Sequence, residues 1–315
     1  LINYINSMAS AKVAVVTGGN KGIGLAIVRA LCKQFKGDVY LTARDPKLGE
    51  EAVRALKEQE GLSPHFHQLD INDLQSIRAL GSFLKEKYGG IDVLINNAGI
   101  AFKGYSVSIA TSHYRAVCDL TPGLSFLSSS GTDPTPFGTQ ANVTLQTNFF
   151  ATRDVCNELL PQYCCVPPGR VVNVSSMLSS SALQGCSPEL QKVFRSDTIT
   201  EEELVTLMEK FVEDAKKGAH QKEGWPNTAY GVSKVGVTVL SRIQARELNE
   251  KRKDDGILLN ACCPGWVRTD MAGPKAPKSP DEGAETPVYL ALLPNNAHSP
   301  HGELVSEKQQ YSVPG

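Results

Sequence analysis

The sequence predicts an α/β fold with a doubly wound parallel sheet and helices on both of its faces. Short uninterrupted apolar runs recur along the chain, as expected of strands that are buried on both faces. Segments with helical apolar spacing separate these runs, and the first run ends in a glycine-rich turn that opens directly into a helix. Since no repeat or linker divides the 315 residues, we expect a single domain over residues 9–310.

The first three units each consist of a strand followed by a helix. Val13–Thr17 is a continuous apolar run that ends at Gly18, and Ile23–Phe35 follows it with apolar residues at helical spacing. The same alternation predicts strands at Val39–Thr42 and His65–Leu69, and helices at Pro46–Gln59 and Leu74–Lys87.

The second half of the chain continues the alternation. A fourth strand, Ile91–Ile95, ends in Asn96-Asn97-Ala98-Gly99. Beyond it we expect helices at Phe137–Leu160 and Tyr230–Leu248, strands at Arg170–Val174 and Ile257–Cys262, and a short final strand near Leu304. Because right-handed crossovers join the strands of such units, the pattern predicts a Rossmann-like sheet.

Two stretches interrupt this order. Residues 187–217 are charged and helical in composition, and Glu201-Glu202-Glu203 opens a second helix within them, so they predict a helical insertion. Gly104–Thr132 contains only two charged residues and no sustained period. A connection of that length is uncommon inside a compact domain, so this insertion is expected to be a loop or disordered, with or without a function of its own.

Composition excludes several classes of protein. The 32 basic and 33 acidic residues give a net charge of −1, which argues against a charge-driven partner such as nucleic acid or an anionic membrane. No apolar stretch is long enough to span a bilayer, and Leu1–Ser7 lack the features of a secretory signal, so we expect a soluble cytoplasmic protein, for which Met8 can be the start. The eight scattered cysteines are expected to be reduced thiols, and no metal site is expected.

A glycine-rich turn connects the first strand to the first helix. In Gly18-Gly19-Asn20-Lys21-Gly22-Ile23-Gly24, the glycines allow a dinucleotide pyrophosphate to approach backbone N–H groups at the positive end of a helix. The spacing departs from the usual Gly-x-Gly-x-x-Gly pattern, and a plain turn is the alternative interpretation.

Tyr230-Gly-Val-Ser-Lys234 places a phenol and an ammonium on one face of a helix. The positive charge of Lys234 favours the phenolate and lowers the pKa of Tyr230 from its usual value of about 10, which suits a general acid or base. Ser176 follows a strand at the carboxyl edge of the sheet, where ligands of such folds bind. A solvated helix face is the alternative interpretation of the Tyr-x-x-x-Lys spacing alone.

Taken together, these motifs resemble the short-chain dehydrogenase/reductase family, especially its monomeric carbonyl reductase branch. The resemblance runs from about Ala11 to Lys308, without Gly104–Thr132, and includes Ile100–Lys103, Thr147–Phe150, Lys222–Pro226 and Cys262–Met271. It implies a catalytic tetrad of Asn148, Ser176, Tyr230 and Lys234. In this tetrad, Tyr230 protonates the carbonyl oxygen, Ser176 hydrogen-bonds it, Lys234 holds the nicotinamide ribose and Asn148 supports a water chain to Lys234.

Charge at the end of the second strand favours NADP(H) as the cofactor. Ala43 stands where NAD enzymes of the family carry an acid, Arg44 follows it, and Lys21 adds a second cation. Asp45 is the counter-argument that keeps NAD open, although its place before Pro46 is typical of a residue that leads a helix. The cofactor-binding positions that the resemblance implies are Gly18, Asn20, Lys21, Gly22, Ile23, Gly24, Arg44, Asp70, Asn97, Tyr230, Lys234, Val267 and Thr269.

The resemblance also implies substrate contacts. They fall on Phe102, Lys103, Ser176, Ala229, Tyr230, Trp266 and Met271, of which Phe102, Lys103, Ala229 and Tyr230 match positions that contact glutathione in the branch. Core packing is the alternative for Trp266 and Met271. Cys263 lies nearby and is either a reactive thiol or an inert small hydrophobe.

We therefore expect NADPH-dependent reduction of ketones, aldehydes and quinones, including prostaglandin-type substrates. The helical insertion is similar to a segment that covers an association surface in monomeric members, so we expect a monomer, with a surface decoration as the alternative. A different class is also kept open: a catalytically impaired nucleotide-binding variant whose insertion at residues 104–132 disrupts the substrate pocket.

Overall fold

A single sheet organises the part of the chain that the computed structural model describes, residues 12–102, 133–162 and 169–311. Its strands follow the order β3-β2-β1-β4-β5-β6-β7-β8, and all neighbours are parallel except the last pair. The strands are β1 (Val13–Val16), β2 (Asp38–Ala43), β3 (His65–Gln68), β4 (Val93–Asn96), β5 (Arg170–Val174), β6 (Leu258–Cys263), β7 (Leu304–Ser306) and β8 (Gln309–Tyr311). This order is that of the predicted doubly wound sheet.

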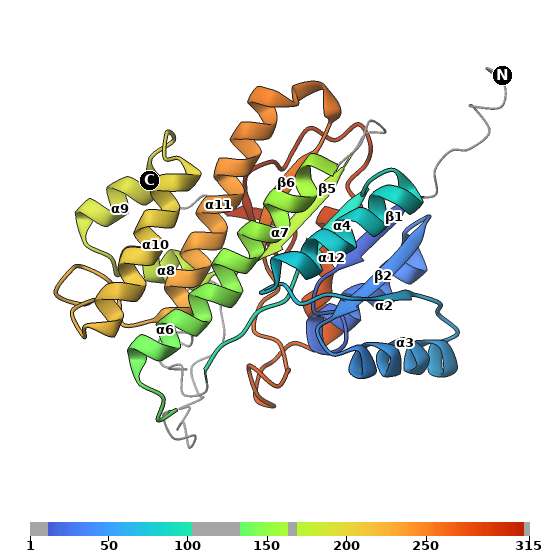
Figure 1. The fold of residues 1–315 in the computed structure, drawn as a ribbon, viewed down its shortest axis with the longest axis horizontal. Coiled ribbons are helices and arrows are strands. Elements are labelled where there is room, and N and C mark those ends of the chain that lie inside the picture. Colours follow the sequence, from blue (N-terminus) through green and yellow to red (C-terminus); the bar gives the residue numbers. More distant parts are fainter. Residues whose placement is uncertain (1–11, 103–132, 163–168, 312–315) are drawn as a thin grey trace.

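Helices cover both faces of this sheet (Figure 1). They are α2 (Gly22–Gln34), α3 (Pro46–Glu60), α4 (Leu74–Tyr88), α6 (Phe137–Leu145), α7 (Ala151–Leu159), α8 (Leu178–Gln184), α9 (Pro188–Arg195), α10 (Glu201–Lys216), α11 (Ala229–Lys251) and α12 (Pro280–Ala291). Alternate residues of β1 point to opposite faces. Ala14 and Val16 pack in the core beneath α2, α3 and α12, whereas Val13 and Val15 pack in the core beneath α4 and α7.

The helical insertion expected at residues 187–217 contains α9 and α10. Thr200 and Glu203 form a capping box that starts α10. Leu204, Met208 and Phe211 of α10 then pack in one apolar core with residues of α6 and α11. On the same helix, the carboxylate of Asp214 accepts hydrogen bonds from Lys210 Nζ at 2.7 Å and from Trp225 Nε1 at 3.1 Å.

The structure corrects several predicted elements. The expected helix Phe137–Leu160 is divided into α6, a π-helical turn over Gln146–Phe150, and α7. The expected short final strand is a pair, β7 and β8, and the sequence analysis did not foresee α8 or α12. The insertion at residues 104–132 lies outside the described residues. Within the described ranges, no helix is long and apolar enough to span a membrane.

Candidate active site

The predicted site residues follow the strands at the carboxyl edge of the sheet. Because β1 to β6 are parallel, all of their carboxyl ends lie at this one edge. The glycine-rich turn follows β1, Arg44 follows β2, Asp70 follows β3, Asn97 follows β4, Ser176 follows β5, and Val267 and Thr269 follow β6. Six strand ends thus supply these predicted site residues, whereas Asn148, Tyr230 and Lys234 come from helical segments.

The glycine-rich turn is shaped by close backbone approaches. Gly18 and Gly22 have φ values of +63° and +56°, in the left-handed region that favours glycine. A Cβ atom on Gly24 would lie 2.2 Å from the carbonyl oxygen of Gly18 and 2.5 Å from Nδ2 of Asn97. Asn97 Nδ2 donates to the carbonyl oxygens of Thr17 and Gly18 at 3.0 and 3.1 Å, so the end of β4 holds the turn in place.

The start of α2 fits an anionic group. The N-cap residue Lys21 makes no side-chain capping bond and the first turn contains no acidic residue, so neither competes for the backbone N–H groups there. Those groups and the helix dipole favour a negative charge, such as the pyrophosphate of a dinucleotide. The close backbone approach at Gly24, where a Cβ atom would not fit, is consistent with such a group.

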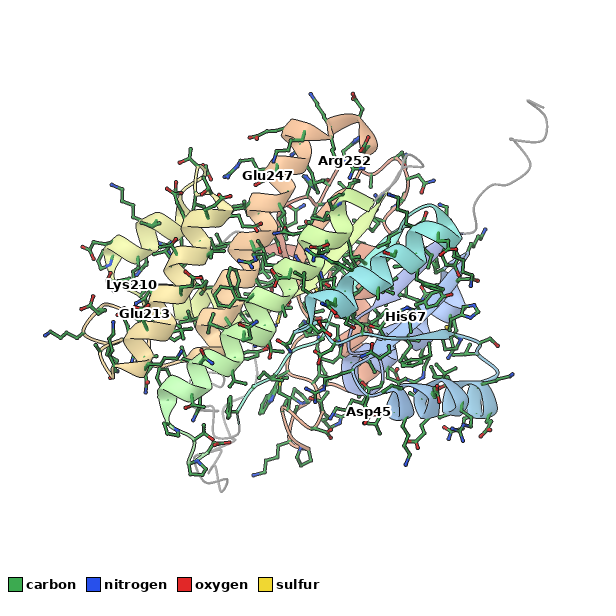
Figure 2. All side chains as sticks on the ribbon, viewed as in Figure 1. Asp45, His67, Lys210, Glu213, Glu247 and Arg252 are labelled. Atoms are coloured by element: carbon green, nitrogen blue, oxygen red, sulfur yellow. The ribbon has the colours of Figure 1, made fainter. Side chains whose placement is uncertain are left out.

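Arg44 and Asp45, the charged residues after β2, have different predicted roles: a contact to a 2′-phosphate and the start of a helix. Asp45 caps α3, since its Oδ1 accepts from the backbone N–H of Lys47 at 2.9 Å and of Leu48 at 3.3 Å (Figure 2). This confirms its interpretation as a residue that leads a helix. Lys21 forms an ion pair with Asp270 at 2.7 Å, whereas Arg44 is exposed and forms no ion pair within the described residues. Arg44 is therefore the stronger candidate for a 2′-phosphate contact.

Lys234 and Tyr230 lie on the same face of α11. Thr228 caps this helix, and its Oγ1 accepts from the backbone N–H of Gly231 at 2.9 Å. Lys234 Nζ lies 5.5 Å from the centre of the Tyr230 ring and donates to the carbonyl oxygen of Val174 at 2.7 Å. Since Val174 ends β5 two residues before Ser176, this bond joins the helix of Tyr230 to the strand of Ser176. Burial of Lys234 lowers its pKa to about 8.

Asn148 lies in the π-helical turn between α6 and α7 and is buried. Its Oδ1 accepts from the backbone N–H of Ile100 at 2.8 Å, and its Nδ2 donates to the carbonyl oxygen of Ile100 at 2.9 Å and to Ser233 Oγ at 3.0 Å. The Ser233 hydroxyl in turn donates to the carbonyl oxygen of Tyr230 at 2.7 Å. The sequence analysis selected Asn148 but missed Ser233, although Ser233 lies inside the Tyr-x-x-x-Lys motif.

Comparison with known proteins places this site in a family. The short chain dehydrogenase family model matches residues 12–121. Carbonyl reductase [NADPH] 1 of Homo sapiens is 67% identical over 297 residues, which cover 94% of this chain and 96% of that protein. The chain belongs to the short chain dehydrogenase family.

Solved structures agree with this assignment. Salutaridine reductase from Papaver somniferum is 30% identical with a TM-score of 0.76, and the match covers 93% of this chain and 99% of that one. Menthone neomenthol reductase from Mentha piperita is 31% identical with a TM-score of 0.74, over 96% of this chain and 100% of that one. The predicted short chain dehydrogenase fold is thereby confirmed.

The predicted substrate positions of this short chain dehydrogenase differ in exposure. Ala229 is buried at the start of α11, and Trp266 is half-buried after β6. Met271 is 46% exposed, which excludes ordinary core packing as its role. Phe102 is the last described residue before the gap, and Lys103 lies outside the described residues.

The described cysteines of this short chain dehydrogenase are unpaired thiols. They are Cys32, Cys156, Cys186, Cys262 and Cys263, and all but the first are buried. Burial raises the pKa of Cys156 to about 12, so its thiol is not a nucleophile at neutral pH. Among the described residues, no three His, Cys, Asp or Glu side chains gather as a metal site.

Proposed function

We propose that this chain is an NADPH-dependent carbonyl reductase that converts ketones, aldehydes and quinones to alcohols and hydroquinones. The observation that carries the proposal is the 67% identity with a relative named carbonyl reductase [NADPH] 1 over nearly the whole length of both chains. The placement of Ser176, Tyr230 and Lys234 at one edge of the sheet supports it.

Tyr230 is the proposed proton donor to the carbonyl oxygen of the substrate. Its phenol lies beside Lys234, whose positive charge stabilises the phenolate that remains after proton transfer. Ser176 is proposed to donate a hydrogen bond to the same oxygen, which stabilises the negative charge that develops there. The backbone N–H of Leu178 donates to Ser176 Oγ at 3.1 Å, so the hydroxyl hydrogen remains available for the substrate.

The cofactor positions fit NADPH. The turn from Gly18 to Gly24 and the start of α2 would hold the pyrophosphate, and Arg44 would contact the 2′-phosphate. Lys234 would hold the nicotinamide ribose. When bound, NADPH supplies the hydride that the reduction requires.

The substrate is proposed to enter beside Trp266 and Met271, which would supply apolar contacts for bulky carbonyl compounds, including prostaglandin-type molecules. Phe102, Lys103, Ala229 and Tyr230 are the proposed contacts for glutathione conjugates. We further propose that the protein is cytoplasmic and that it is a monomer. The monomer is supported by α10 of the helical insertion, which packs against α6 and α11 and occupies that surface.

The test is NADPH oxidation by the full chain with menadione or an aromatic aldehyde, in parallel with fluorescence titration of NADPH. Turnover with either substrate is expected. Tight NADPH binding without turnover would overturn the proposal in favour of the impaired nucleotide-binding variant, for which no comparison gives support.

A further inference from the structure

A cavity lies outside the predicted active site, and it is cationic. It has a volume of about 350 Å³ and lies between α8, α9, α11 and the strands β7 and β8. None of the residues that line it belongs to the predicted catalytic, cofactor or substrate set. Its volume is within the range of small-molecule sites.

Arg195, Arg242 and Arg246 line this cavity. Arg242 Nη2 donates to the carbonyl oxygens of Phe194 and Ser196 at 2.5 and 3.0 Å. The other two arginines also donate to neutral acceptors: Arg195 to the side chain of Gln191, and Arg246 to backbone carbonyl oxygens. None of the three takes part in an ion pair within the described residues, whereas Arg29, Arg78, Arg153 and Arg252 all do.

The positive charge of the cavity is not balanced by its own lining. Among the described residues of that lining, Glu303 is the one carboxylate, against three guanidinium groups. His301 adds no charge, since its Nδ1 accepts from the backbone N–H of Leu259 and its Nε2 bonds to the carbonyl oxygen of Ala245. Burial and repulsion from Arg246 lower the pKa of Arg242, while Asp197 raises it from beyond ion-pair distance. An anion in the cavity would relieve this repulsion.

Apolar side chains form part of the cavity wall. Leu183 of α8 and Val235 and Val239 of α11 are buried side chains that line the cavity together with its charged groups. A ligand that matches both parts has an anionic head and an apolar body. Inorganic anions alone would leave the apolar wall without a partner.

We propose that this cavity binds a small amphiphile with a carboxylate head, whose charge pairs with Arg195, Arg242 and Arg246 and whose chain packs on Leu183, Val235 and Val239. The site is adjacent to the active site without overlapping it. The hydroxyl groups of Ser179 and Thr238, which also line the cavity, are hydrogen-bonded to each other, and that of Thr238 is hydrogen-bonded to Ser175. Ser175 Oγ in turn donates to the carbonyl oxygen of Lys234 at 3.1 Å.

The chain offers an internal reporter for a binding test. It has two tryptophans, so Trp266→Phe leaves Trp225 as the single indole. The Trp225 ring lies 6.0 Å from the ring of Phe194, which lines the cavity. In this background, titration of the full chain with decanoate is expected to give a saturable change in tryptophan fluorescence, and the neutral analogue decanol is expected to bind at least tenfold more weakly.

Variants separate this cavity from any other binding place. Arg242→Met is expected to weaken decanoate binding at least tenfold, and Val239→Phe, which fills the cavity, to abolish it. Glu303→Gln removes the negative charge from the lining and leaves the three arginines unchanged, so it is expected to tighten decanoate binding several-fold. This variant keeps the test valid if Arg242→Met does not fold. Arg78→Met, on the exposed face of α4, is the matched control and is expected to leave binding unchanged.

The proposal is overturned if decanol binds as tightly as decanoate, if no saturable change occurs, or if Val239→Phe and Glu303→Gln both bind decanoate as the parent does. Since the readout is binding and not turnover, failure of this proposal is distinguishable from failure of the proposed reductase activity.

Discussion

Lys234 connects the electrostatics of the site to its geometry. Its ammonium is removed from water, and within the described part of the chain it donates a hydrogen bond to the carbonyl oxygen of Val174. Burial without a carboxylate partner disfavours the charged form, and this lowers the pKa of Lys234 to about 8. We therefore expect Lys234 to exchange its proton near pH 8, and its charge is the one proposed to favour the Tyr230 phenolate.

The first prediction is an alkaline limb in the activity. Lys234 is charged below its pKa, so raising the pH through about 8 removes the charge that supports Tyr230. We expect kcat/KM for a carbonyl substrate to fall above pH 8, since this parameter reports groups of the free enzyme. Lys234→Arg keeps the positive charge at every accessible pH, so in this variant kcat/KM should begin to fall only at a higher pH. If it still falls above pH 8, another group causes the decrease.

The second prediction concerns the proton donor. Tyr230→Phe removes the phenolic proton and leaves the ring, so turnover should fall by several orders of magnitude while NADPH affinity stays within a few-fold. Turnover and fluorescence titration of NADPH measure the two effects separately. A variant that keeps more than a tenth of the original turnover would exclude Tyr230 from this role.

The third prediction concerns the 2′-phosphate. Arg44→Ala removes a charge-assisted hydrogen bond worth about 1.5–3 kcal/mol, so NADPH binding should weaken roughly ten- to a hundredfold. NADH lacks the phosphate, and its affinity should hardly change. Arg54→Ala, on the neighbouring helix α3, is the control for a general loss of positive charge. Equal losses for NADPH and NADH would show that Arg44 does not contact the phosphate.

At the scale of elements, the π-helical turn over Gln146–Phe150 connects two parts of the candidate site. It carries Asn148, whose amide bonds to the backbone of Ile100 after β4 and to Ser233 of α11. One side chain thus links the segment that enters the 104–132 insertion with the helix of Tyr230. We therefore expect a change in the path of the chain after Ile100 to affect helix α11 through Asn148.

The fourth prediction tests the insertion at residues 104–132. Phe102 and Asp133 are the described residues nearest to it, and Ile100, four positions before residue 104, is held against Asn148. A misplacement of about 1 Å at such a site can cost on the order of a hundredfold in rate. Replacing residues 104–132 with a two-residue connection is expected to raise kcat/KM at least tenfold with little change in NADPH affinity. Equal activity of both forms would show that the insertion does not impair the site.

At the scale of the whole molecule, the sequence predicted those helices, strands and motifs that are determined by residues close together in the chain. Uniformly apolar strands such as Val13–Val16, and the sequence motif that contains Tyr230 and Lys234, carry their signal in a few consecutive residues. Helix α12 has no such local signal, since Gly283 and Pro287 interrupt the apolar spacing that would predict a helix. A Cβ on Gly283 would lie 2.6 Å from Val267, so a tertiary contact requires glycine there. The pairing of Lys21 with Asp270, 249 positions apart, was equally invisible from the sequence.

The last prediction is the oligomeric state. In this chain α10 places Leu204, Met208 and Phe211 in a shared core with α6 and α11, so these two helices have an intramolecular partner on that surface. An association that needed the same surface would first have to remove this packing, and replacing a buried Phe with Ala alone costs about 3–5 kcal/mol. We therefore expect light scattering after gel filtration to give the mass of one chain, 34.0 kDa, at every protein concentration tested. A mass of two or four chains that persists on dilution would show that the protein associates through another surface, and that the helical insertion is a decoration without effect on assembly.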